Sequence, residues 1–153
     1  MQGNTIKTFQ IPNRLPDLVE ISQDVFEWFD ELPISAHAKY ASRLAIEEWV
    51  SNTIKYGYDD DGEHFITLSI TLDDRYLGLT FEDDGRPFDP TAREPISIED
   101  AISMQPAGGI GLELLLRLCD DISYVREDGL NRLSLFISKM DPDHTPHATL
   151  QPM

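Results

Sequence analysis

The stretch from Ala36 to Tyr58 has the apolar periodicity of one long amphipathic helix, but its apolar stripe ends in polar residues. The stripe begins with Ala38, Ala41, Leu44 and Ala45. The next three positions on it are Glu48, Asn52 and Lys55. Burying a charged or amide group without a partner costs several kcal/mol. A stable fold therefore requires these side chains to satisfy one another or to face a polar ligand.

The overall composition is that of a small and strongly acidic globular protein. The chain has 153 residues, of which 41% are hydrophobic and 26% are charged, so we expect one domain with a real core. The formal net charge of −16 argues against binding to nucleic acid or to an anionic membrane, because both require a basic surface. The sequence shows one cysteine, no signal sequence and no apolar run of membrane-spanning length, so we expect a cytoplasmic protein.

Hydrophobic periodicity predicts an α+β fold. Alternation predicts five strands, at residues 5–11, 66–72, 77–81, 122–126 and 133–137. Helical spacing predicts three helices, at residues 15–33, 36–58 and 112–119, with Ser35 as the N-cap of the second helix. The first helix is expected to bury Leu15, Leu18, Val19, Phe26 and Phe29, and Trp49 is expected to pack in the core. Short turns join strands two and three, and strands four and five, into hairpins, so we expect a two-layer α/β sandwich with a mostly antiparallel sheet and helices on one face.

Two segments lack a strong periodic signal. Residues 86–107 carry four prolines and only a weak helical signal at residues 96–104. A connection of this length inside a small domain is typical of a binding loop or a lid. The polar, proline-containing stretch at residues 141–153 is expected to be disordered. We therefore predict one folded domain at residues 1–140, followed by a tail.

The polar triplet has two interpretations. In the structural one, Glu48 and Lys55 reach solvent at the edge of the stripe, and Asn52 binds a backbone carbonyl. In the functional one, Asn52 offers its amide oxygen to Mg²⁺, a hard cation that takes few protein ligands and keeps phosphates and waters. Lys55 would then place a positive charge beside phosphate, and Glu48 would act as a general base on a hydroxyl or a water. Three polar residues in register favour the functional interpretation, because buried charges are rare unless paired or bound to metal.

Two glycine-containing segments downstream also favour a ligand. Asp83-Asp84-Gly85 follows a predicted strand, and on its own it is an ordinary turn. In a binding site, Asp83 would accept the exocyclic amine of adenine, and Gly85 would let the backbone approach the base. The segment Gly108-Gly109-Ile110-Gly111-Leu112 leads into a helix, whose N-terminal amides and dipole favour phosphate, although a flexible hinge is the alternative. It matches neither the Walker A pattern nor the dinucleotide-binding fingerprint.

In this order, the three segments resemble the N, G1 and G2 boxes of the GHKL (Bergerat-fold) ATPase superfamily. Within it the chain is similar to the stand-alone anti-sigma-factor serine/threonine kinases of bacterial partner-switching systems. The segments that carry this resemblance are Glu48–Tyr56, Arg86–Pro90 and Arg126–Leu133. Sensor histidine kinases, by contrast, usually have asparagine where Glu48 stands, and they carry phosphoacceptor-histidine helices that this sequence lacks.

The resemblance implies a set of roles. ATP would bind with adenine on Asp83 and Gly85, with Mg²⁺ on Asn52, and Glu48 would orient or deprotonate a serine or threonine hydroxyl. The residues implied in nucleotide binding are Asn52, Lys55, Asp83, Gly85, Pro87, Phe88, Gly108, Gly109, Ile110, Gly111 and Leu112. The expected partner is a STAS-domain anti-anti-sigma-like protein, which would compete with a sigma factor for the helical face beside the lid. Relatives of this kind are often dimers, so a homodimer is a further expectation.

Two rival hypotheses remain open at this point. The chain could be a non-catalytic, ATP-binding interaction module that sequesters a regulatory partner, in which case Glu48 would have no chemical role. It could also be a hydrolytic ATPase, which would release ADP steadily without any partner. Substitution of Glu48 separates the kinase from the non-catalytic module.

Overall fold

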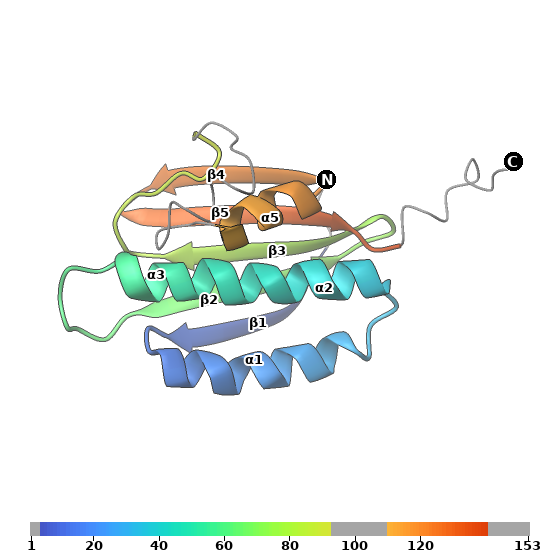
Figure 1. Cartoon of the computed structure of the whole chain (residues 1–153), viewed down its shortest axis with the longest axis horizontal. Coiled ribbons are helices and arrows are strands. Elements are labelled where there is room, and N and C mark those ends of the chain that lie inside the picture. Colours follow the sequence, from blue (N-terminus) through green and yellow to red (C-terminus); the bar gives the residue numbers. More distant parts are fainter. Residues whose placement is uncertain (1–3, 93–109, 141–153) are drawn as a thin grey trace, which may run out of the picture.

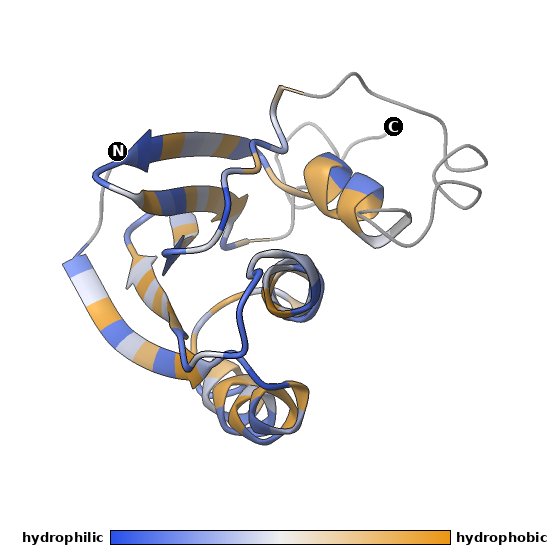
Figure 2. Ribbon diagram, turned by 90° about the vertical axis from the view of Figure 1, so that its left-hand side faces the viewer, coloured by the Kyte–Doolittle hydropathy of each residue, from blue (hydrophilic) through white to orange (hydrophobic). Residues whose placement is uncertain are grey.

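The computed structural model describes residues 4–92 and 110–140, which form a five-stranded sheet with helices packed on one face (Figure 1). The strands are β1 (Asn4–Pro12), β2 (Phe65–Leu72), β3 (Tyr76–Asp83), β4 (Asp121–Glu127) and β5 (Leu130–Ser138). The helical segments are α1 (Leu15–Phe29), α2 (Ala36–Ala45), η1 (Ile46–Val50), α3 (Ser51–Tyr56) and α5 (Ile110–Leu118). Figure 2 shows these helices on the same side of the curved sheet. The predicted two-layer α/β sandwich is confirmed.

The sheet order is β1-β2-β3-β5-β4, and every neighbouring pair is antiparallel. Both predicted hairpins are present, because β2 pairs with β3 and β4 pairs with β5. The turn between β4 and β5 contains Asp128 and Gly129, whose φ angles of 55° and 80° lie in the left-handed region that tight hairpin turns require. Since β3 lies between β2 and β5, the end of β3 at Asp83 is flanked by a strand on each side.

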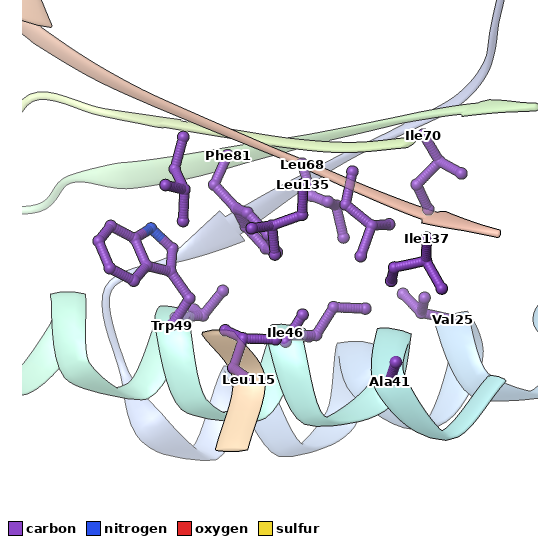
Figure 3. Close-up of a cluster of buried hydrophobic side chains, with 14 of the residues drawn as sticks. Val25, Ala41, Ile46, Trp49, Leu68, Ile70, Phe81, Leu115, Leu135 and Ile137 are labelled. Carbon is purple, nitrogen blue, oxygen red and sulfur yellow. The ribbon is translucent and has the colours of Figure 1, made fainter. Parts of the chain in front are cut away.

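One hydrophobic core fills the space between the sheet and the helices (Figure 3). The strands contribute inward-facing aliphatic and aromatic side chains, including Leu68, Ile70, Phe81, Leu135 and Ile137. The helices contribute Val25, Ala41, Ile46, Trp49 and Leu115 from the opposite layer. Polar side chains occupy many of the positions that alternate with these on the strands, as in the 3.1 Å hydrogen bond between Thr80 Oγ1 and Ser134 Oγ. This alternation fixes the register, because a slip of one residue would turn the apolar set toward solvent.

The predicted helix at residues 36–58 contains a π-helical turn, η1, between α2 and α3. Its start is as predicted, with the Ala38 N–H donating to Ser35 Oγ at 3.1 Å. The wider turn rotates the following residues, so the buried face continues through Trp49, Val50 and Thr53. Consequently the three polar residues of the predicted stripe are not fully buried. Glu48 and Asn52 are half-buried, and Lys55 is exposed. The prediction that all three point inward was wrong for Lys55, because a 3.6-residue period does not carry across a π turn.

Helix α1 is shorter than predicted, and its buried face agrees with the prediction at Leu18 and Phe29 but differs elsewhere. It ends at Phe29, and its buried residues are Leu18, Ser22, Val25 and Phe29. Leu15 and Val19, expected in the core, are 39% and 63% exposed. Two overlapping apolar stripes are possible on this helix, one with Leu15 and Val19 and one with Ser22 and Val25. Packing against β1 and the neighbouring helices buries the second stripe.

Several predictions concern residues outside the described ranges, namely the weak helix at 96–104, the glycines Gly108 and Gly109, and the tail at 141–153. Within residues 4–92 and 110–140, every helix is too short or too polar to span a bilayer.

Candidate functional site

A pocket of about 220 Å³ opens where the end of α3 meets the end of β3. Its walls come from η1, α3 and the chain that follows β3, and the lining residues are Trp49, Asn52, Thr53, Tyr56, Gly57, Asp83, Arg86, Pro87 and Phe88. Four of these, Asn52, Asp83, Pro87 and Phe88, are residues that the sequence proposed for nucleotide binding. The fold therefore brings the first and second polar segments together around one cavity.

Asp83, the last residue of β3, presents a buried and firmly oriented carboxylate to this pocket. The residue is 4% exposed. Its Oδ1 accepts hydrogen bonds from the backbone N–H of Gly85 at 2.8 Å and from Asn131 Nδ2 at 2.9 Å. Burial raises the pKa of Asp83, and these two hydrogen bonds oppose that rise. Its Oδ2 accepts no hydrogen bond from the described part of the chain, so this oxygen can accept one from a ligand.

The loop after β3 is fastened to the end of α3, and this close approach requires glycine at position 85. A Cβ on Gly85 would lie 2.8 Å from the backbone oxygen of Gly57 and 3.0 Å from Asp83 Oδ1. The next N–H, of Arg86, donates to the same Gly57 oxygen at 2.8 Å. Arg86 also forms an ion pair with Asp59. These contacts fix the wall of the pocket that contains Arg86 and Pro87.

Asn131 is a buried site residue that the sequence did not single out. It lies opposite Asp83 on β5 and is 4% exposed. Its Nδ2 donates to Asp83 Oδ1, to the Gly85 carbonyl at 3.2 Å and to the Arg86 carbonyl at 3.0 Å. A signal for it does exist, because Asn131 continues the inward alternation of Leu133, Leu135 and Ile137. A polar residue at an inward position near a strand end is a candidate for a site.

An aromatic pair forms the apolar wall of the pocket. The rings of Trp49 and Phe88 stack with centroids 5.9 Å apart and an interplanar angle of 26°. Trp49 is 4% exposed, whereas Phe88 is 46% exposed. Trp49 was predicted to pack in the core, and it does so while its ring also lines the pocket. A flat apolar wall of this kind suits a planar heteroaromatic base.

Glu48 lies on the π turn, and its carboxylate packs against the first turn of α5. A Cβ on Gly111 would overlap the Glu48 carboxylate, so any larger residue at this position would displace that side chain. Within residues 4–92 and 110–140, the Glu48 carboxylate has no hydrogen-bond or ion-pair partner. The fold thus brings the predicted base to the helix terminus predicted to hold phosphate, although the two lie far apart in the sequence.

Asn52 and Lys55 occupy different environments. Asn52 lines the pocket, and its side-chain amide has no hydrogen-bond partner in the described part of the chain, so it binds no backbone carbonyl there as the structural interpretation required. Lys55 is exposed and is not among the lining residues. No group of three or more His, Cys, Asp or Glu side chains able to hold a metal occurs in residues 4–92 and 110–140. A metal here would therefore take few protein ligands, and the amide oxygen of Asn52 is free to be one.

Only part of the third segment is described. Ile110 and Gly111 begin α5, and Leu112 is completely buried in the core. The Leu112 side chain therefore belongs to the core and does not itself face a phosphate.

Beside the pocket, His64 connects the loop after α3 to the end of β3. Its Nε2 lies 2.9 Å from Asp60 Oδ1, and its Nδ1 lies 3.2 Å from Asp84 Oδ1. The ring stacks on Tyr58 with centroids 4.2 Å apart. A protonated imidazole donates from both nitrogens, whereas a neutral one has a single N–H. The hydrogen bond to Asp60, and then that to Asp84, raises the pKa of His64 above its ordinary value of 6.5, although partial desolvation opposes this.

This raised pKa gives a pH-dependent contribution to stability. Because the folded pKa lies above the unfolded one, the contribution of His64 should be complete below pH 6.5 and should disappear as the pH rises through the folded pKa. We expect the melting temperature of the wild type to exceed that of His64→Gln at about pH 6 and to approach it at about pH 9, measured by thermal unfolding in matched buffers. His37→Gln is the control, because the His37 side chain has no hydrogen bond or ion pair with the residues that the structure describes. A difference between wild type and His64→Gln that is constant with pH would contradict this expectation.

Comparison with known proteins gives consistent matches. A protein-family model described as "Histidine kinase-like ATPase domain" matches residues 11–137. The serine/threonine-protein kinase BtrW of Bordetella bronchiseptica is 28% identical over 117 residues, which cover 73% of this chain and 82% of that protein. The serine-protein kinase RsbW of Listeria monocytogenes is 28% identical over 95 residues, which cover 58% of this chain and 59% of that protein. The match thus spans less than two thirds of the Listeria kinase.

A solved structure shares the fold at low sequence identity. The histidine kinase domain of the blue-light activated histidine kinase from Erythrobacter litoralis EL346 superposes with a TM-score of 0.52 at 14% identity. The superposition covers 81% of this chain and 60% of that one. At this identity the likeness shows a common fold alone.

Proposed function

Because the chain belongs to the histidine kinase-like ATPase domain family, we propose that it binds Mg-ATP beside Asp83 and phosphorylates a serine or threonine of a protein partner. The observation that carries this proposal is the buried Asp83 carboxylate, whose Oδ1 is held by Gly85 and Asn131 while Oδ2 is left for a donor in the pocket. The exocyclic N6 amine of adenine is such a donor, whereas guanine has an acceptor, O6, in the corresponding place. The aromatic wall formed by Trp49 and Phe88 supports the same assignment.

The residues present also fit a magnesium ion bound with the nucleotide. Mg²⁺ is usually held in such sites by one or two protein oxygens together with phosphates and waters. Asn52, whose amide on the pocket wall has no partner among the described residues, would provide this oxygen. The bound ion would neutralise charge on the phosphates, and the exposed Lys55 could add a second positive charge from outside the pocket.

The position of Glu48 supports the transfer of a phosphoryl group to a hydroxyl. In the proposed step Glu48 accepts the proton of the substrate hydroxyl while that oxygen forms a bond to the γ-phosphorus. The bond between the γ-phosphorus and the bridging oxygen breaks, and ADP leaves with its electron pair. The contact of Glu48 with Gly111 at the start of α5 would keep this base beside the phosphates, which the backbone N–H groups of residues 108–112 would bind.

The partner follows from the relatives and from the resemblance to anti-sigma-factor kinases. The relatives are a serine/threonine-protein kinase and serine-protein kinases. We propose a STAS-domain anti-anti-sigma-like protein as the phosphorylated partner and a sigma factor as its competitor, both bound by a homodimer of this chain. We also propose that the kinase domain extends over residues 1–140, a range that contains the whole family match.

Thermal unfolding of the wild type with and without Mg-ATP tests the proposal. A ligand at ~100 times its dissociation constant adds about 2.7 kcal/mol to the free energy of unfolding. For a chain of this size we expect the melting temperature to rise by roughly 5–10 °C with Mg-ATP and to change little with Mg-GTP. Equal shifts with both nucleotides would contradict the adenine assignment, and no shift with either would overturn the proposed function.

A further inference from the structure

We propose that Tyr124 is a positioning residue that couples the nucleotide-binding carboxylate of Asp83 to the pocket wall containing Phe88. This inference rests on the function proposed above and deepens it. Tyr124 lies on β4, the edge strand next to β5, and it is not one of the residues that line the pocket. Its influence on a ligand must therefore pass through other residues.

A hydrogen-bonded chain runs from Phe88 to Asp83 through Tyr124. The backbone N–H of Phe88 donates to the hydroxyl oxygen of Tyr124 at 3.3 Å. That hydroxyl donates in turn to Asn131 Oδ1. The Asn131 amide then donates to Asp83 Oδ1 at 2.9 Å. Every donor in this chain points toward the carboxylate, and hydrogen bonds aligned in one direction polarise and strengthen one another.

The chemistry of its neighbours fixes the direction of this chain. The carbonyls of Gly85 and Arg86 can only accept hydrogen bonds, so the side of Asn131 that faces them must be its NH₂ group. The Oδ1 of Asn131 then faces Tyr124, whose hydroxyl must donate to it. A hydroxyl that has donated its single proton keeps lone pairs with which to accept from the Phe88 N–H.

The sheet provides a rigid support for this chain. Tyr124 lies opposite Leu133 on β5, two residues along from Asn131. Ser123 and Val125, on either side of Tyr124, are also paired with β5. Arg126, two residues further along β4, donates to the Gly85 carbonyl at 2.7 Å. The β4–β5 hairpin therefore holds the backbone segment from Gly85 to Phe88 at several points. Among the hydrogen bonds of this hairpin to described residues, the one from the Phe88 N–H to Tyr124 is the one that reaches the residue stacked on Trp49.

Removing the Tyr124 hydroxyl should loosen both Phe88 and Asp83, the two ends of the hydrogen-bonded chain. The Phe88 N–H would lose its acceptor, so the stack of Phe88 on Trp49 would be less well held. Asn131 Oδ1, in a residue that is 4% exposed, would lose its donor, so the amide could rotate away from Asp83. The acceptor for the base and the apolar wall beside it would then both be less well ordered before the nucleotide arrives.

The test compares Tyr124→Phe with the matched variant Tyr40→Phe, in a Trp28→Phe background where Trp49 is the single tryptophan. Tyr40 is 57% exposed on α2 and has no role in the site. In the ligand-free protein we expect Tyr124→Phe, and not Tyr40→Phe, to shift Trp49 emission to longer wavelength and to increase its quenching by acrylamide. By calorimetry we expect the dissociation constant for Mg-ATP to rise about threefold to tenfold in Tyr124→Phe alone.

A double-substitution cycle shows whether Tyr124 acts through Asn131. If both belong to one chain, Tyr124→Phe should have little further effect on the Mg-ATP dissociation constant once Asn131→Ala is present. Independent, additive effects would overturn the inference. An unchanged Trp49 signal together with an unchanged Mg-ATP affinity in Tyr124→Phe would also overturn the inference. If the substitution lowered the melting temperature and changed nothing else, Tyr124 would only stabilise the fold. If the wild type does not bind Mg-ATP, the proposed function fails, whereas the ligand-free Trp49 signal still decides whether Tyr124 holds Phe88.

Discussion

Replacing Asp83 with asparagine should weaken Mg-ATP binding on the order of 100-fold, because the new amide presents a donor where the adenine amine needs an acceptor. The Oδ1 position is committed to the Gly85 N–H and the Asn131 amide, so the asparagine oxygen must occupy it. The NH₂ group then takes the place of Oδ2 and faces the pocket. The unliganded protein should remain folded, since burial already disfavours the charged form of Asp83, whose pKa is raised.

Thermal unfolding and calorimetry with Mg-ATP measure this effect. We expect the shift in melting temperature given by Mg-ATP to be nearly abolished in Asp83→Asn and to persist in Asp84→Asn. Asp84 is a suitable control because it is the next carboxylate in the chain, but its side chain is 50% exposed and faces His64 instead of the pocket. If Asp83→Asn binds Mg-ATP as tightly as the wild type, adenine does not bind at this carboxylate.

Replacing Glu48 with glutamine should lower the rate of phosphoryl transfer by about 10²- to 10⁴-fold while leaving Mg-ATP affinity nearly unchanged. Glutamine keeps the size of the side chain that packs on Gly111, so the start of α5 should not move. It cannot accept a proton from a substrate hydroxyl. The expected result is therefore a loss of turnover at constant nucleotide affinity.

The assay follows transfer of labelled γ-phosphate to the partner protein, together with calorimetric binding of Mg-ATP. Glu47→Gln is the matched control, because Glu47 is the adjacent carboxylate on the same turn but is exposed. Full transfer activity in Glu48→Gln would remove the assigned base. If neither the wild type nor any variant transfers phosphate, while all of them bind Mg-ATP, the non-catalytic interaction module becomes the better description.

The fold was predictable where local periodicity decides it. The alternation around Leu68 and Leu79 specifies two strands whose apolar faces must lie on the same side of the sheet, and the intervening turn makes them a hairpin. The Asp128-Gly129 pair specifies the second hairpin in the same way, because few residues adopt positive φ.

Local periodicity fails where packing changes the helical geometry. The π turn at residues 46–50 moves the buried face from Glu48 to Trp49, and the sequence pattern gave no sign of this additional rotation. On α1 the prediction was wrong for Leu15 and Val19 for a related reason, since Val19 and Val25 lie on overlapping apolar stripes and only the position of the sheet chooses between them.

The sequence by itself determined the layered fold, the two hairpins, and the candidate residues Asp83, Asn52 and Glu48. These are properties of single residues or of short windows, in which side-chain chemistry and the period of the backbone are sufficient.

The tertiary structure alone decided which of the candidates meet. Asn131 reaches Asp83 through the pairing of β3 with β5, and Glu48 reaches Gly111 because α5 packs beside η1. Lys55 is turned outward by the π turn. Each of these contacts depends on chain segments that are distant in sequence and are brought together by burial of the common core, so no local pattern can contain them.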